Sequence, residues 1–216
     1  MPRKTRLDRV MRSAAALFAA DGFAAASVSR LARLARVSKP GIYYHVRDKE
    51  ELLFRICDDS MAGILAGARG AVAAADEPVA RLRGVMRAHA RFHWQHPNNL
   101  AILFGQMAYL SPERRRRIVV RERAYLDLVR GLIREGMRRR AFRRVDPSVA
   151  AFALFAMLNT LDAWYDPRGR LGPEALVREL ERLYLDGLAA PGPPRAIARS
   201  DILGPRGRRD RRRCLR

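Results

Sequence analysis

The chain has 216 residues, 49% of them hydrophobic, and carries a formal net charge of +21 at pH 7. This hydrophobic content excludes a chain that is disordered throughout, and no apolar run approaches the roughly 20 residues that a membrane-spanning helix needs. The positive charge favours an anionic partner such as nucleic acid, although only three of the 43 basic residues are lysines, and so strong an arginine bias also reflects codon usage.

The first residues and the cysteines bear on the compartment. The sequence opens into an amphipathic stretch without the apolar core of a signal peptide. Cys57 and Cys214 make a poor disulfide framework, because Cys214 lies in a strongly charged segment. We therefore expect a cytoplasmic protein with no membrane partner.

Apolar residues recur at spacings of three and four through the first 189 residues, without sustained two-residue alternation, so the sequence predicts an all-α fold. Helix starts are marked by pairs of a capping residue and a proline, such as Ser111–Pro112 and Asp146–Pro147. About nine helices are predicted, near residues 6–20, 28–35, 39–45, 49–74, 78–95, 97–109, 112–140, 147–165 and 173–189.

Residues 190–216 differ in composition, since Pro, Gly and Arg dominate them. They hold too little apolar surface to offset the entropy of ordering the chain, and we predict a disordered basic tail. Such a tail is either a solvated terminus or an additional non-specific contact to phosphate.

Residues 27–46 contain two short helical segments across a tight turn. Apolar residues at helical spacing predict the inward face of the first segment, Val28, Leu31, Leu34 and Ala35. In the second segment Ile42 and Val46 point inward, which leaves an outward face of Lys39, Pro40, Tyr43, Tyr44 and His45. Two helices joined in this way predict a helix-turn-helix, whose second helix fits the major groove of DNA.

The segment "AAALFAADGFAAASVSRLARLARVSKPGIYYHVRDKEELL" resembles the DNA-binding domain of the TetR family of bacterial transcriptional repressors. It shares the Leu-Phe-x-x-x-Gly-Phe run, the Leu-Ala-x-x-Ala-x-Val-Ser turn and the Tyr-x-His followed by Lys, over about residues 8–60. Two positions depart from the pattern: Ser27 stands where Thr is commoner, and Arg36 replaces a small turn residue. The resemblance implies a DNA-binding domain at 1–48 and a helical effector-binding and dimerisation domain at 49–189.

Carried over position by position, the resemblance implies two sets of DNA contacts. Phosphates would be held by Ser27, Ser38, Tyr43, His45 and Lys49. Base edges would be faced by Lys39, Pro40, Gly41 and Tyr44, and Ser29 and Arg30 would enter the groove from the first segment. The implied partner is a double-stranded operator with a pseudo-palindromic sequence, bound by a homodimer.

Three histidines, His89, His93 and His96, lie on the otherwise apolar stripe of the helix near 78–95. Their spacing would align nitrogens for a metal, but no Cys or acidic residue stands at ligand spacing beside them. Three alternatives remain: hydrogen-bonded pocket or core histidines, surface or interface histidines, and a metal site, of which the first is favoured. We expect no cofactor.

The helix near 147–165 carries a stripe of mostly small residues, with Asn159 alongside: Val149, Ala153, Ala156, Thr160, Ala163 and Trp164. Small residues leave room for a neighbouring helix or for a ligand beside Trp164. The helix near 173–189 has its own apolar stripe, formed by Leu176, Leu180, Leu183 and Tyr184, and we expect these two helices to build the dimer interface.

Residues 96–188 are similar to the C-terminal domain of TetR-family repressors that sense acyl-CoA thioesters of lipid or sterol breakdown. The similarity rests on the Leu-Ser-Pro-Glu-Arg segment at 110–114, on Arg121, Arg123 and Tyr125, and on the Trp164-Tyr165 pair with the Pro, Gly and Leu that follow it. It implies an apolar tunnel for the acyl chain and cations for the phosphates, the latter among Arg114 to Arg117, Arg121 and Arg123. Candidate ligand-binding residues are Phe92, His93, Leu103, Phe104, Met107, Arg121, Tyr125, Asn159, Thr160 and Trp164.

The leading hypothesis is a ligand-responsive transcriptional repressor that leaves its operator when it binds an acyl-CoA thioester. A repressor of an efflux or other pathway that senses a different small apolar ligand is the alternative within this class. An architectural DNA-binding protein without sequence preference is a further alternative, supported by the net charge. No catalytic set of residues is recognisable, and we do not expect an enzyme.

Overall fold

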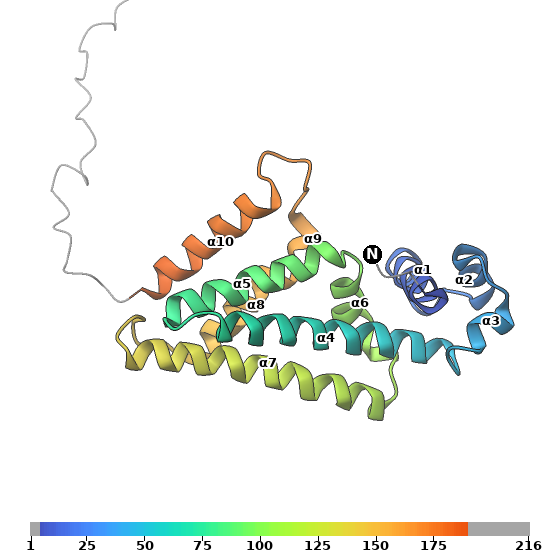
Figure 1. Cartoon of the computed structure of the whole chain (residues 1–216), viewed down its shortest axis with the longest axis horizontal. Helices are drawn as coiled ribbons and strands as arrows, with labels where there is room; N and C mark the ends of the chain where they lie inside the picture. The colour runs from blue at the N-terminus through green and yellow to red at the C-terminus, as the bar shows by residue number, and fades with distance from the viewer. Residues whose placement is uncertain (1–4, 190–216) are drawn as a thin grey trace, which may run out of the picture.

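In the computed structural model, residues 5–189 are described, apart from the side chain of Asp162, and they form helices joined by short turns (Figure 1). The helices are α1 (Arg6–Asp21), α2 (Val28–Ala35), α3 (Lys39–Tyr43), α4 (Lys49–Ala73), α5 (Pro78–Gln95), α6 (Asn99–Gln106), the 3₁₀ helix η1 (Met107–Tyr109), α7 (Pro112–Arg138), α8 (Pro147–Asn159), α9 (Leu161–Trp164) and α10 (Pro173–Leu188). The all-α prediction is confirmed over this range. The predicted basic tail, 190–216, lies outside the described residues.

One predicted helix is divided, because the segment near 147–165 stops at Thr160 and resumes as α9. The predicted starts at Pro112 and Pro147 are confirmed. The Asp146 side chain accepts hydrogen bonds from two backbone N–H groups of the first turn of α8, and Thr5 closes a capping box with Asp8 at the start of α1. These bonds satisfy amide groups that have no partner inside a helix.

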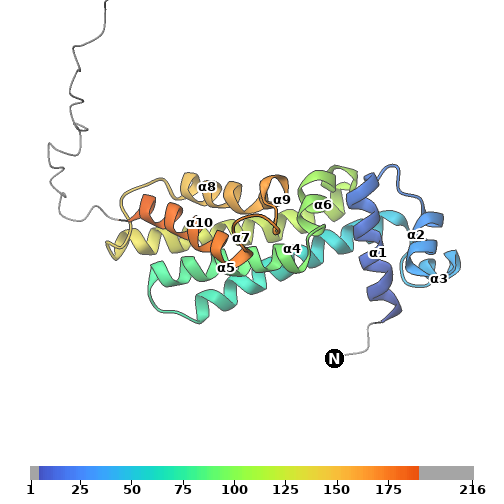
Figure 2. The ribbon, with the colours of Figure 1, turned by 90° about the horizontal axis from the view of Figure 1, so that it is seen from above.

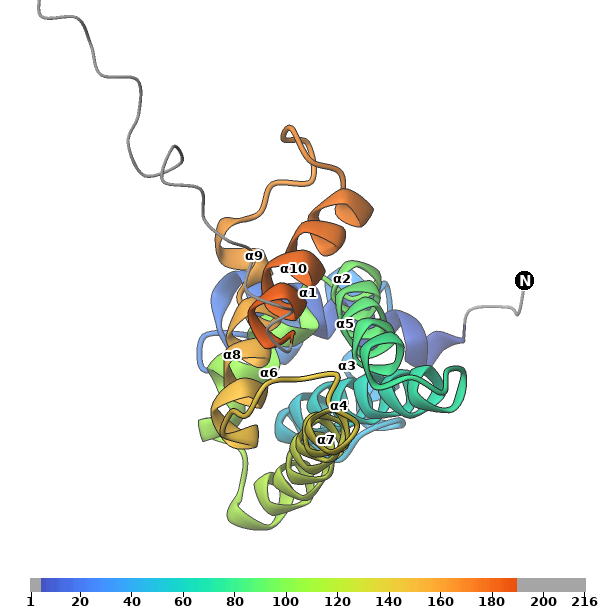
Figure 3. The ribbon, with the colours of Figure 1, turned by 90° about the vertical axis from the view of Figure 1, so that its left-hand side faces the viewer.

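Helices α1, α2 and α3 gather at one end of the molecule, and α4 runs from them into a bundle with α5, α7 and α8 (Figures 1 and 2). Seen along the bundle, α10 lies beside α5 and α8, on the side away from α7 (Figure 3). Glu181 of α10 is buried, and its carboxylate accepts hydrogen bonds from the Arg87 guanidinium of α5 at 2.6 and 3.0 Å. Tyr184 Oη donates to the Ala150 carbonyl of α8 at 2.7 Å. Helix α10 is thus held within its own chain.

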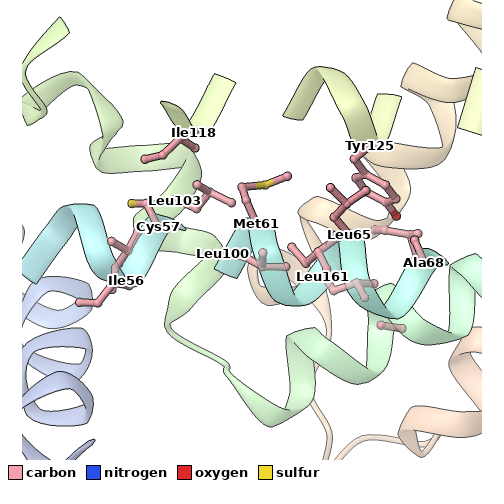
Figure 4. Close-up of a cluster of buried hydrophobic side chains, with 14 of the residues drawn as sticks. Ile56, Cys57, Met61, Leu65, Ala68, Leu100, Leu103, Ile118, Tyr125 and Leu161 are labelled. Atoms are coloured by element: carbon pink, nitrogen blue, oxygen red, sulfur yellow. The ribbon is translucent and has the colours of Figure 1, made fainter. Parts of the chain in front are cut away.

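The core extends along most of α4, and Figure 4 shows part of it, from Ile56 to Ala68. The side chains that α4 buries in it include Ile56, Cys57, Met61, Leu65 and Ala68. They face α6 and α7 through Leu100, Leu103 and Ile118, all fully buried. On another side, α4 and α5 approach closely: a Cβ at Gly63 would lie 2.6 Å from the Phe92 ring.

Polar contacts join α1–α4 to the bundle at α6 and α7. The Gln106 amide at the end of α6 donates to the Phe18 carbonyl at 2.7 Å and accepts from the Phe23 N–H at 2.8 Å. The Glu50 carboxylate accepts from the Ser111 N–H at 2.8 Å and pairs with Arg114 at 3.2 Å. These contacts connect the end of α1 and the start of α4 to the segment between α6 and α7.

The packing of Gly136 gives a test of the fold. An ideal Cβ at this buried position of α7 would lie 2.0 Å from the Phe142 ring, whereas a Cβ at Gly131 of the same helix meets nothing within 4 Å. We expect Gly136→Ala to lower the free energy of unfolding by about 1–3 kcal/mol, and the matched Gly131→Ala to raise it by about 0.5–1 kcal/mol. Urea denaturation measures both, and equal effects of the two variants would contradict the packing described.

Candidate DNA-facing surface and ligand cleft

The turn between α2 and α3 is made by Arg36 and Val37. The side chains of Ser27 and Ser38 cap the two helices by accepting from the N–H groups of Arg30 and Gly41, at 3.2 and 3.1 Å. Arg36 adopts a left-handed conformation with φ of 52°, which a residue with a side chain enters at a cost of about 1–2 kcal/mol. The departure at Arg36 therefore fits the tight turn without a glycine.

Helix α3 presents the predicted outward face. Ile42 is buried, whereas the Tyr44 side chain is 86% exposed and its ring meets the His45 ring edge-on at a centroid distance of 5.1 Å. Lys39 and Pro40 are exposed as well. The inward face predicted for α2 was wrong at one position: Leu34 is 52% exposed, and Ala32 is buried instead.

The structure gives Lys49 a role inside the protein. Its ammonium group donates to the carbonyls of Phe23, Ala24 and Ala26, at 2.7, 3.3 and 2.9 Å, and lies 4.4 Å from the centre of the Phe23 ring. An ammonium group has three N–H donors, so none is left for a phosphate in this arrangement. Lys49 holds the loop between α1 and α2, and we therefore do not propose it as a phosphate contact.

Arg30 and two other arginines complete this surface. Arg30 forms an ion pair with Asp21, which holds it against the end of α1. Arg33 and Arg36 are exposed and have no ion pair within residues 5–189. The family resemblance assigned no DNA contact to either arginine. Their position at the turn of a helix-turn-helix marks them as candidate phosphate contacts.

A cleft of about 300 Å³ lies in the larger part of the molecule, between α4, α5, α6, α7 and α8. Its lining is mainly apolar and aromatic and consists of Met61, Ile64, His89, Phe104, Glu122, Arg123, Tyr125, Leu126, Phe152, Phe155 and Asn159. Three predicted ligand-binding residues, Phe104, Tyr125 and Asn159, line it. The two phenylalanines of α8 were missed because periodicity alone does not say which helix faces a ligand.

The other predicted ligand-binding residues lie outside this lining. His93 and Leu103 are buried, Met107 is partly buried against the core, and Thr160 and Trp164 are exposed. The remaining two have partners elsewhere: the Phe92 ring stacks on His96 at 4.6 Å, and Arg121 binds Asp58 at 2.8 Å.

The arginines proposed for phosphates are also largely engaged. Arg114 pairs with Asp48 and Glu50, and Arg115 donates to the carbonyl groups of Met107, Ala108 and Leu110. Arg117 lies over the Phe54 ring. Arg123, which lines the cleft, has no ion pair among the described residues.

A buried pair of polar side chains lies at the cleft. His89 is 2% exposed, and its Nδ1 is 3.0 Å from Tyr125 Oη. Burial, together with the nearby His93, lowers the pKa of His89 to about 3, and burial raises the pKa of Tyr125. Both groups are therefore neutral near pH 7.

Of the three alternatives for the histidines, His89 and His93 fit the core or pocket position, and His96 is exposed at the end of α5. Within residues 5–189 no three His, Cys, Asp or Glu side chains are grouped to hold a metal ion. In the same range, every helix is too short or too polar to span a bilayer.

The small-residue stripe of α8 faces outward. Val149 and Trp164 are more than half exposed, and the alanines and threonine between them are exposed as well. In α10, Leu176, Leu180 and Tyr184 are buried within the chain, and only Leu183 of the predicted stripe is exposed. The outward apolar surface is therefore carried mainly by α8, since α10 uses its stripe internally.

Comparison with known proteins gives matches over both parts of the chain. Residues 10–56 match the family described as "Bacterial regulatory proteins, tetR family", and residues 75–188 match "Tetracyclin repressor-like, C-terminal domain". The HTH-type transcriptional activator FasR of Mycolicibacterium smegmatis is 26% identical over 133 residues, which cover 62% of this chain and 61% of FasR. The match thus spans less than two thirds of that relative.

Two solved structures cover nearly the whole described range. The TetR family transcriptional regulator PfmR of Thermus thermophilus is 33% identical with a TM-score of 0.78, over 84% of this chain and 99% of PfmR. AibR, in complex with isovaleryl coenzyme A and operator DNA, is 28% identical with a TM-score of 0.77, over 87% of this chain and all of that one.

The buried His89 predicts a pH dependence of stability. Its pKa is about 3 in the fold and about 6.5 in an unfolded chain, so between these values the unfolded state binds the additional proton. The stability that the neutral ring contributes is present above pH 6.5 and is lost as the pH falls toward 3. We expect the wild type to lose about 2 kcal/mol more than His89→Asn between pH 7 and pH 5. Urea denaturation at both pH values measures this difference, and parallel losses would contradict it.

Proposed function

The chain belongs to the tetR family of bacterial regulatory proteins, and from that premise we propose that it is a ligand-responsive DNA-binding transcriptional regulator. The observation that carries the proposal is the exposed face of α3. Ile42 anchors this helix in the core, while Lys39, Pro40 and Tyr44 face solvent at the end of the molecule farthest from α10. Packing of the protein core does not require solvent-facing Lys, Pro and Tyr side chains on one short helix. A helix with these side chains on its outer face fits the major groove of DNA.

We assign base contacts to Lys39, Pro40, Gly41 and Tyr44. A lysine donates to guanine acceptors, and a proline ring contacts the methyl group of thymine. Ser29 of α2 is assigned to the groove. Phosphates are assigned to the residues at the margins of α2 and α3, namely Ser27, Ser38, Tyr43 and His45, with Arg33 and Arg36 added from the structure. The DNA-binding unit is taken as 1–48 and the regulatory unit as 49–189. A regulator of this kind acts in the cytoplasm.

Dimerisation is proposed through the outward face of α8, with Leu183 of α10 at its margin. A monomer would expose this apolar face to water, and two-fold pairing of the same face on two chains removes it. Two recognition helices related by a two-fold axis then require a pseudo-palindromic operator.

The effector is proposed to bind in the cleft that Phe104, Tyr125 and Phe155 line. Aromatic and aliphatic walls suit an apolar group, and a volume of about 300 Å³ suits a compact one. An acyl-CoA thioester is supported by AibR, which binds isovaleryl coenzyme A, and by Arg123, a cation at the cleft without an ion pair among the described residues. Arg123 replaces the wider arginine cluster as the candidate phosphate contact.

Helix α6 offers a physical connection between effector and DNA. Phe104 lines the cleft, and two residues later Gln106 holds the end of α1 through both atoms of its amide. A ligand that displaces Phe104 would shift Gln106, and with it α1 and the adjoining α2. A hundredfold change in operator affinity requires about 2.7 kcal/mol of differential binding between the two states.

Repression with release by the ligand is the form of regulation that we propose. FasR, which resembles this chain over part of its length, is named an activator. Transcription from the selected operator, with and without the protein, separates the two signs of regulation.

Lys39 provides the test of sequence recognition. We expect Lys39→Ala to reduce the preference for operator over random DNA by about 1–3 kcal/mol, because a contact to base edges is lost. Arg168→Ala, which removes the same charge from the loop between α9 and α10, should leave that preference unchanged. Selection from random DNA supplies the operator, and fluorescence anisotropy measures the affinities. Failure to enrich any palindrome would favour an architectural DNA-binding protein.

Ala153 tests the dimer. This exposed residue lies within the outward face of α8, and a long charged side chain there would have to be buried on pairing. We expect Ala153→Arg to be monomeric at micromolar concentration in sedimentation velocity, while wild type and Ala80→Arg, an exposed position of α5, stay dimeric. A dimeric Ala153→Arg would place the interface elsewhere.

Acyl-CoA thioesters and the matching free acids test the effector. We expect thioesters to release operator DNA, and Arg123→Gln to raise the concentration needed by about tenfold, since a charge-assisted contact is lost. Arg116→Gln, on an exposed face of α7 outside the cleft, should respond as wild type does. Equal release by free acids would remove the thioester from the proposal and leave a different apolar effector.

A further inference from the structure

Two residues that line the cleft carry buried polar atoms that have no hydrogen-bond partner in the described part of the chain. His89 is almost wholly buried, and its Nε2 has no hydrogen-bond partner within residues 5–189. Asn159, the last residue of α8, likewise has a buried side-chain oxygen without a partner in that range. Both residues line the same cleft. Unsatisfied buried polar atoms are costly, and two beside one cavity indicate groups that a ligand completes.

The His89–Tyr125 pair limits what a ligand can offer. Both side chains are neutral, so they hold two polar hydrogens between them, and their mutual bond uses one. If Tyr125 donates to Nδ1, the second hydrogen sits on His89 Nε2; if Nδ1 donates, Nε2 is an acceptor. The ring therefore adapts to either a donor or an acceptor, whereas the Asn159 oxygen requires a donor.

Glu122 adds a negative group to this wall. It lines the cleft next to Arg121 and Arg123 in sequence, yet within the described range it has no ion pair, because Arg121 is turned to Asp58. Partial burial raises the pKa of its carboxyl group. Its lone pairs, like the oxygen of Asn159, call for hydrogen-bond donors, and a ligand carboxylate placed beside it would be repelled.

We propose that this cleft selects an apolar ligand with a hydroxyl group on its buried part, held by Asn159 and His89. A hydroxyl donates its one hydrogen to the Asn159 oxygen, and its lone pairs accept from His89 Nε2–H in the tautomer in which Tyr125 donates to Nδ1. A ketone only accepts and leaves Asn159 unsatisfied, and a hydrocarbon leaves both groups unsatisfied. The inference rests on the proposed siting of the effector here, and for a thioester it places the hydroxyl on the acyl group.

Borneol, camphor and camphane test the inference, because they share one rigid skeleton and differ in carrying a hydroxyl, a ketone or neither. We expect the wild-type protein to bind borneol about tenfold more tightly than the other two in calorimetric titrations, the value of about one net hydrogen bond. Asn159→Leu should bring borneol to within about twofold of camphor. The matched Asn98→Leu, outside the cleft, should keep the tenfold preference.

Glu122 is tested with octanoate, which we expect to bind Glu122→Gln at least tenfold more tightly than wild type. Glu113→Gln, on the same helix outside the cleft, should not differ from wild type. Circular dichroism establishes that each variant is folded before titration.

The inference is overturned if wild type binds camphor or camphane as tightly as borneol, or if the borneol preference survives in Asn159→Leu. The proposed function fails separately. If borneol shows the expected preference but leaves operator binding unchanged, the cleft selects hydroxylated ligands without regulating DNA binding. If none of the three binds at millimolar concentration, both the inference and the siting of the effector are overturned.

Discussion

Helix α4 has to bury side chains against two different sets of neighbours, and the position of both functional regions follows from that constraint. Its first turns contact α1 and its middle contacts α5, α6 and α7, so Leu52 and Leu65 belong to one continuous core. A helix packed along its whole length resists bending, because each displaced side chain would leave a void. A displacement at the cleft would therefore reach the α1–α3 end mainly through helices that move as units.

Charged side chains also connect the α1–α3 end of the molecule to the helical bundle. Three arginines of α7 bind groups of the neighbouring elements: Arg114 and Arg121 pair with carboxylates of α4, and Arg115 donates to carbonyl groups of η1. The net charge of +21 therefore overstates how many positively charged side chains are available to bind a ligand. Arg33 and Arg36, which have no ion pair among the residues that the structure describes, lie near the α2–α3 turn, where a phosphate backbone would run beside α3. The position of the charged residues, rather than their number, determines which of them can contact a phosphate.

The cleft and the α8 surface meet at Phe152, which lines the cleft and is also exposed. The break at Thr160 ends α8 and leaves Asn159 in the cleft wall, while the small residues of the stripe face outward. One helix therefore carries part of the cleft wall and the proposed dimer surface on adjacent faces. A substitution on the outward face of α8 affects the cleft wall and the reverse, because their side chains are separated by only part of a helical turn.

Interactions between residues close in sequence made several features of this structure predictable. Proline and capping residues located the starts of α7 and α8, and the short motif around Ser38 located α3, because helix starts depend on groups within a few residues. The outward face of α3 was predictable for the same reason. The resemblance to acyl-CoA-sensing repressors pointed to Tyr125, and Asn159 was noted alongside the small-residue stripe of its helix.

Tertiary structure decided what each face meets. Lys49 binds carbonyl groups 23 to 26 residues away, and Arg87 binds Glu181 at a separation of 94. The large apolar stripe of α10 turned inward and the small-residue stripe of α8 outward, although both have the spacing of one helix face. Helical spacing fixes the angle of a side chain around its own axis, but the partner on that side is set by the packing of all helices together.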